Sequence, residues 1–143
     1  MANVEIIGVK EIQKVLEDFA PRIANNLMKA TIHGIASEVT KEAKKRVPKR
    51  TGTLKKSLKT KRRRGKPGQP VSDVIADSGK AAKNDGFYWR FVEYGTQSGM
   101  TAQPFMRPAK DKVFSNMPEI LRRQFKDKLT KAVNREKKKR AKK

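Results

Sequence analysis

The chain has 143 residues, with 36 Lys and Arg against 14 Asp and Glu, a formal net charge of +22 at pH 7 and no cysteine. This length suits a single domain, and the lack of cysteine excludes a disulfide framework and a thiolate metal site. The first residues, MANVEIIGVKEIQ, are not expected to be a signal peptide, and no stretch has the roughly 20 apolar residues that a membrane helix needs.

The apolar fraction of 36% is below the roughly 45–50% of ordinary globular domains, so we expect a modest core with polar extensions. Self-repulsion at this net charge weakens a compact monomer. A polyanionic partner such as DNA, or an acidic neighbouring subunit, would relieve it. A solvated basic surface with a disordered tail is the alternative, and charge alone does not separate the two.

Two helices are predicted in the first third of the chain, after a short β-type run at residues 4–7. Residues 10–19 carry apolar side chains at the spacing of an amphipathic helix. Residues 22–47 are predicted to form a longer helix, which follows Pro21 because proline suits a first turn. The helix ends before Pro48, because proline disfavours helix in the residue that precedes it.

The middle of the chain is predicted to supply three strands. Residues 54–60, after a turn at residues 51–53, give a weak strand signal, and residues 71–76 give a short strand. Residues 87–94 (FYWRFVEY) give the strongest strand prediction, central in the sheet, because they are aromatic, β-branched and nearly all apolar. The basic stretch at residues 61–70 is predicted to be a loop.

A C-terminal helix is expected to begin near Pro108, with Pro118 kinking or dividing it. Residues 136–143 contain little that could pack, so we expect them to fray unless a partner orders them. The prediction is an α+β fold, in which a small antiparallel sheet of three or four strands is packed by a long central helix and a C-terminal helix. We expect one α+β domain over residues 1–130 and a basic extension over residues 131–143, flexible unless bound.

No pattern of catalytic or metal-binding residues is found. His33 is the sole histidine and lies within a predicted helix, where a structural role is favoured, and the phosphate-loop pattern GxxxxGK[ST] is absent. Glu93 stands out because it lies in the most apolar predicted strand and would need a partner, such as Arg or Lys, if buried. An enzyme would have only Glu93 and His33 to use, so we expect neither catalysis nor a cofactor.

Two segments, residues 41–66 and 122–143, hold much of the positive charge. Such runs bind phosphate backbones with little sequence preference, and known DNA-reading signatures are missing. The aromatic residues of 87–94 could stack on bases, but a core strand is favoured. A tail that aids solubility or contacts acidic protein is the alternative. The candidate contacts with DNA or an acidic partner are Lys61, Arg62, Arg63, Arg64, Lys66, Lys137, Lys138, Lys139 and Arg140.

Two short motifs occur in a fixed order. Residues 46–58 (RVPKRTGTLKKSL) hold a Val-Pro helix end and a Thr-Gly-x-Leu-x-x-Ser turn. Residues 91–109 (FVEYGTQSGMTAQPFMRPA) hold Val-Glu-aromatic-Gly-Thr and Gln-Pro-Phe-x-Arg-Pro-Ala. This ordered set resembles the small head–tail joining proteins of long-tailed bacteriophages, also called neck, tail-completion or gene-product-ten-like proteins. The matching residues are Val47, Pro48, Thr51, Gly52, Leu54, Ser57, Val92, Glu93, Tyr94, Gly95, Thr96, Gln103, Pro104, Phe105, Arg107, Pro108 and Ala109.

The resemblance implies a structural virion protein in the neck, made in the host bacterial cytoplasm. It implies a ring of identical subunits around the DNA channel, between a head-completion or connector protein and tail terminator or tube proteins. The motif residues would shape the subunit for assembly, or serve only its own folding. Channel linings in such phages are often acidic, so we expect at least one basic segment to contact acidic neighbours. A free, sequence-nonspecific nucleic-acid-binding protein is the competing hypothesis.

Overall fold

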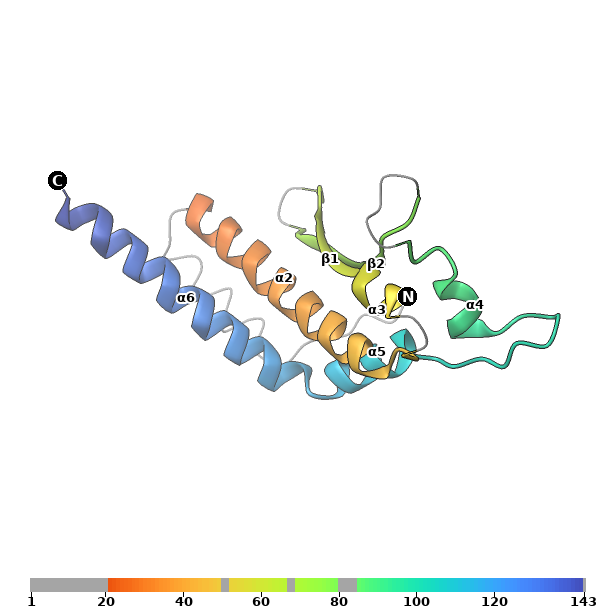
Figure 1. Ribbon diagram of the computed structural model, residues 1–143. Coiled ribbons are helices and arrows are strands. Elements are labelled where there is room, and N and C mark those ends of the chain that lie inside the picture. Colours follow the sequence, from red (N-terminus) through yellow and green to blue (C-terminus); the bar gives the residue numbers. More distant parts are fainter. Residues whose placement is uncertain (1–20, 50–51, 67–68, 80–84, 143) are drawn as a thin grey trace.

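The computed structural model (Figure 1) describes residues 21–49, 52–66, 69–79 and 85–142. The predicted strand at 4–7, the predicted helix at 10–19 and Thr51 lie outside these residues. The described part has the predicted α+β architecture, in which a small antiparallel sheet packs against a long helix and a C-terminal helix.

Helix α2 (Pro21–Arg46) confirms the prediction of a long helix ending before Pro48. Three basic residues in its last turn complement the helix dipole. Its buried positions pack against the sheet and against helices α5 and α6, described below. The Thr40 hydroxyl lies 2.7 Å from the Thr60 hydroxyl and ties this helix to the first strand. The buried positions of α2 are Leu27, Thr31, Gly34, Ile35, Val39, Thr40 and Ala43.

The sheet of the described residues has two antiparallel strands, β1 (Leu58–Arg63) and β2 (Val71–Ala76). The prediction of a strand at 71–76 is confirmed, and the described residues form two strands where three or four were predicted for the chain. The predicted strand at 54–60 is wrong in its first half, which forms helix α3 (Thr53–Ser57). Residues 61–63 belong to β1 and not to a loop, because they pair with residues 71–73, and the ion pair between Arg63 and Asp73 favours this pairing.

The predicted central strand at 87–94 is wrong, because residues Trp89–Tyr94 form helix α4. Burial along this segment follows a helical period. Val92 and Glu93 are buried, whereas Phe91 and Tyr94, on either side of them, are exposed. Individual β propensities were outweighed by the tertiary environment, as is common for short apolar runs.

Two helices complete the chain, α5 (Met106–Ser115) and α6 (Met117–Ala141). Their division at Asn116 confirms that the C-terminal helix is divided near Pro118, which lies in the first turn of α6 where proline is tolerated. Helix α6 continues through most of residues 131–143. The assignment of those residues to a separate extension stays a prediction.

The core holds fewer buried residues toward the amino end of α2. Figure 1 shows α6 running antiparallel beside α2, with the hairpin, α3 and α4 on the other side. In the described residues, a first cluster near the end of α2 has seven buried residues and a middle cluster has six. The third cluster, near the start of α2, has only Leu27 and Phe125 fully buried.

Candidate functional site

A buried carboxylate organises the second motif. One oxygen of Glu93, Oε2, accepts hydrogen bonds from the backbone N–H groups of Phe105 at 2.7 Å and Met106 at 2.9 Å. The other, Oε1, accepts from the backbone N–H and the Nε of Arg107, both at 3.1 Å. The first N–H groups of a helix have no partner within it. Glu93 therefore caps helix α5 from twelve to fourteen residues upstream, and we call this arrangement the Glu93 clamp.

The expectation that a buried Glu93 needs an Arg or Lys partner is confirmed by Arg107. The guanidinium also donates to the Glu93 backbone carbonyl at 3.3 Å and lies 4.9 Å from the ring centre of Tyr94. Burial raises the pKa of Glu93, but the backbone N–H groups of α5 and the Arg107 side chain outweigh it and hold the pKa below its ordinary value. The clamp is therefore charged at neutral pH.

The loop that joins α4 to α5 is fixed at both ends. Gly95 has a φ of 75°, and a Cβ there would lie 2.7 Å from the carbonyl oxygen of Met100. The N–H of Gln103 donates to the carbonyl of Val92 at 2.7 Å, and the N–H of Thr96 donates to that of Met100 at 3.0 Å. The Val-Glu-aromatic-Gly-Thr and Gln-Pro-Phe-x-Arg-Pro-Ala segments are therefore two halves of one hydrogen-bonded unit.

The first motif packs against the second. The first core cluster has seven buried residues. Five of them belong to the matching residues of the two motifs. Ser57 is buried, and its hydroxyl oxygen lies so close to Gly86 that a Cβ at position 86 would clash with it, so Gly86 leaves the room that Ser57 needs. Gly52 has a φ of 70° where α3 begins. The cluster consists of Ala43, Val47, Leu54, Leu58, Val92, Phe105 and Ala109.

The remaining motif residues are less enclosed. Tyr94, Gln103, Pro104 and Arg107 are exposed, and a further five are of intermediate burial. The buried members serve the fold, whereas an assembly role for any motif residue stays a prediction. The partly buried members are Pro48, Gly52, Gly95, Thr96 and Pro108.

Four large apolar side chains are exposed around α4 and the following loop, and we call them the aromatic patch. Their exposed fractions are 64% for Phe87, 49% for Phe91, 61% for Tyr94 and 44% for Met100. Figure 1 shows α4 and its loop at one end of the molecule, beyond the sheet. This patch was not predicted from the sequence, because the segment was expected to lie in the core of a sheet. The i, i+4, i+7 spacing of the three aromatic residues is the signal that could have revealed it.

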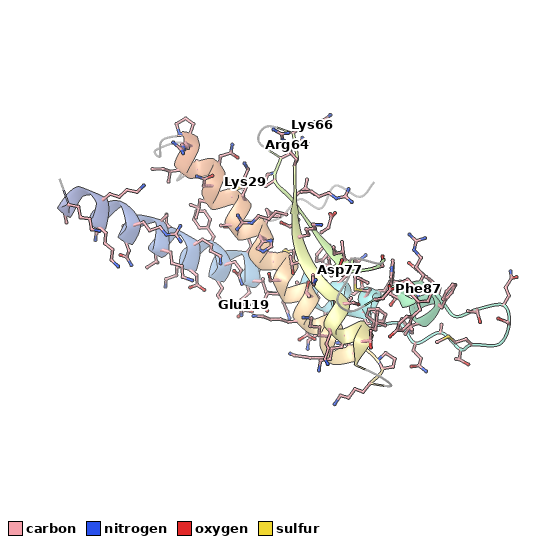
Figure 2. The ribbon with its side chains drawn as sticks, turned by 45° about the horizontal axis from the view of Figure 1, so that its top comes forward. Lys29, Arg64, Lys66, Asp77, Phe87 and Glu119 are labelled. Atoms are coloured by element: carbon pink, nitrogen blue, oxygen red, sulfur yellow. The ribbon has the colours of Figure 1, made fainter. Side chains whose placement is uncertain are left out.

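At the other end of α2, basic side chains line two adjoining hollows of about 620 and 790 Å³. Figure 2 shows Lys29 of α2 facing the hairpin that carries Arg64 and Lys66. Lys61, Lys137 and Lys138 are exposed outside these hollows, and the side chain of Arg140 lies outside the described part. The candidate contact residues in the lining are Arg62, Arg63, Arg64, Lys66 and Lys139.

The described residues meet the requirements of neither a metal site nor a membrane-spanning helix, and His33 lies near basic residues. No group of three or more His, Cys, Asp or Glu among them could hold a metal ion. Of the helices described, none has the length and apolar character that crossing a bilayer requires. His33 lies 3.5 Å from the Ser72 hydroxyl, and its pKa is lowered by burial and by the charges of Arg62 and Lys128.

A comparison with protein families connects this arrangement to a class of bacteriophage structural proteins. The model of the HK97-gp10-like family, described as "Bacteriophage HK97-gp10, putative tail-component", matches residues 10–95. This match covers more than half of the chain, which therefore belongs to the HK97-gp10-like family of phage tail components, and a virion location follows from membership. The resemblance seen in the sequence is confirmed. Searches of curated proteins and of solved structures found no match.

Proposed function

We propose that the protein is a structural component of the phage neck, where a ring of identical subunits joins the head connector to the tail around the DNA channel. Membership of a tail-component family supports this proposal. The observation that carries it is the aromatic patch, which is exposed to solvent although its supporting segment is held by the Glu93 clamp.

An anchored apolar surface suits a permanent subunit contact. Contiguous exposed apolar patches are rare on monomers, and aromatic residues and Met are enriched in interface cores. The clamp holds α4 against α5 before assembly, so little ordering entropy is lost on docking. In a ring, the aromatic patch of one subunit packs against a different surface of the next, as head-to-tail contacts with closing rotation require.

The charge of the subunit fits the same role. A net charge of +22 disfavours contact between identical basic surfaces, so the subunits are expected to meet through the apolar patch. Head-completion or connector proteins on one side, and tail terminator or tube proteins on the other, are the proposed neighbours. The role is non-enzymatic and needs no cofactor.

The test is deletion of the gene from its phage, followed by electron microscopy of the lysate. We expect DNA-filled heads beside separate tails, with joined particles restored by the wild-type gene. A Phe87→Ser/Phe91→Ser variant should fail to restore them. Phe114→Ser, which changes an exposed aromatic residue of α5, is the matched control and should restore them. Normal infectious particles from the deletion phage would overturn the proposal.

A further inference from the structure

Two basic segments that are far apart in the sequence converge on one surface, which we call the basic cleft. Its lining comes from the first turns of α2, from the β1–β2 hairpin and from the last turns of α6. Lys29 and Arg62 line both hollows, so the two are continuous. Figure 2 shows the facing positions of Lys29, Arg64 and Lys66. The basic residues of the lining are Arg22, Lys29, Arg62, Arg63, Arg64, Lys66, Lys128, Lys131, Arg135 and Lys139.

The described lining of this cleft is rich in basic side chains and holds no acidic one. Several ion pairs lie further along α2. Glu38 pairs with Arg123, and Glu42 pairs with Lys45 and with Lys112. Within the lining, Arg63 pairs with Asp73 across the hairpin. The lowered pKa of His33, caused by burial and then by Arg62 and Lys128, is consistent with a positive potential beneath the cleft.

The lining also lacks the side chains that other kinds of partner use. No aromatic residue or Met of the described chain lines the cleft. Proteins that bind single strands stack bases on aromatic rings, and the cores of protein interfaces are enriched in aromatic residues and Met. The apolar contribution to the lining comes from aliphatic side chains, namely Ile23, Leu27, Ala30, Pro70, Val71 and Ala132.

We propose that the basic cleft binds the phosphate backbone of double-stranded DNA, with no reading of bases. Arg and Lys on three separate elements would contact successive phosphates, and the release of counterions would drive binding. Parts of both basic segments, at residues 62–66 and 128–139, then face the same DNA, in contrast to the expectation that at least one segment contacts acidic neighbours. The inference does not depend on the joining role, because it concerns a surface of the single subunit and is tested on the purified protein.

The test measures binding of the full chain to a fluorescently labelled 30-base-pair duplex by anisotropy, over a series of salt concentrations. The cleft variant is Lys29→Glu/Arg64→Glu/Lys66→Glu. The control, Lys49→Glu/Lys55→Glu/Lys56→Glu, makes the same change in net charge with exposed residues at and beyond the other end of α2. We expect the cleft variant to bind at least about tenfold more weakly than the control. Its log–log salt slope should be shallower by roughly 2 to 3, since each phosphate contact contributes about 0.9.

Three outcomes would overturn the proposal. Equal weakening by both triple variants would show that net charge alone attracts DNA. Tighter binding of the wild type to polyglutamate than to the duplex would favour an acidic protein partner. Tighter binding to a single strand of the same length would exclude a duplex site. Circular dichroism checks folding, and Lys29→Gln/Arg64→Gln/Lys66→Gln repeats the test should the reversed charges unfold the chain.

Discussion

The two ends of α2 differ in how their surfaces are formed. At its carboxyl end, seven buried residues and the Glu93 clamp fix α4, the following loop and α5, and the aromatic patch lies on this support. At its amino end, only Leu27 and Phe125 of the described residues are buried together, and exposed Lys and Arg dominate. Directional bonds and close packing shape the first surface, whereas long-range charge defines the second.

This difference predicts opposite sensitivities. The aromatic patch is supported by a few buried groups, so a single substitution of one of these buried groups should destabilise the subunit. The basic cleft depends on the sum of many exposed charges, so single substitutions should have small effects on stability and on binding, and high salt should weaken binding.

The largest expected effect tests the packing of the anchored end. Phe105 is fully buried in the first core cluster, so Phe105→Ala should lower the free energy of unfolding by about 3–5 kcal/mol. Urea unfolding followed by circular dichroism measures this change. Phe114→Ala removes a half-exposed ring and should cost less than about 1 kcal/mol. Similar losses in the two variants would contradict a core centred on Phe105.

The second prediction tests the clamp. Glu93→Gln keeps the shape of the side chain but removes its charge and turns an amide donor toward the N–H groups of α5. The expected loss is about 2–3 kcal/mol, because hydrogen bonds to charged groups are strong and the buried donors lose their acceptor. Asp111→Asn, an exposed carboxylate on the same helix, should change the unfolding midpoint little. An unchanged midpoint for Glu93→Gln would show that the clamp does not stabilise the fold.

A third prediction concerns the loop after α4. Gly95→Ala forces a side chain into a backbone conformation that L residues rarely adopt and against the Met100 carbonyl, so we expect a loss of about 1–3 kcal/mol. Gly99→Ala shares the positive φ but meets no atom within 4 Å, so its smaller loss isolates the cost of the clash. Thermal unfolding of both variants makes the comparison. A larger loss for Gly99→Ala would contradict the close approach at Gly95.

The smallest predicted effect is a difference in acid sensitivity. The pKa of Glu93 is lowered by folding, so the clamp stabilises fully above the ordinary value of 4.5, and this stabilisation is lost as pH falls through the lowered pKa. Glu42 and Asp77 also have lowered pKa values and contribute in the same direction. Comparing wild type with Glu93→Gln from pH 7 to pH 3 separates Glu93 from them. The two stability curves should approach one another in acid, and parallel curves would contradict the assignment.

Much of the architecture could be predicted from the sequence, because its signals are local. The flanking prolines predicted the bounds of α2, a short strand was predicted at the position of β2, and Pro118 predicted the division of the last helix. The segment at 87–94 misled the prediction, because its aromatic residues have high strand propensity. Their spacing also fits a helix, and the helix forms because one of its faces, with Val92 and Glu93, is buried against the rest of the fold.

The tertiary structure alone decided which groups meet. The sequence indicated that Glu93 would need a partner if buried, but its bonds to the start of α5 depend on a loop that returns the chain to α4. Likewise, the sequence showed two basic segments, and the packing of α6 along α2 beside the hairpin brought them into one cleft. Periodicity and propensity act over a few residues, whereas capping by a distant carboxylate and the summation of charge across elements depend on distances in space.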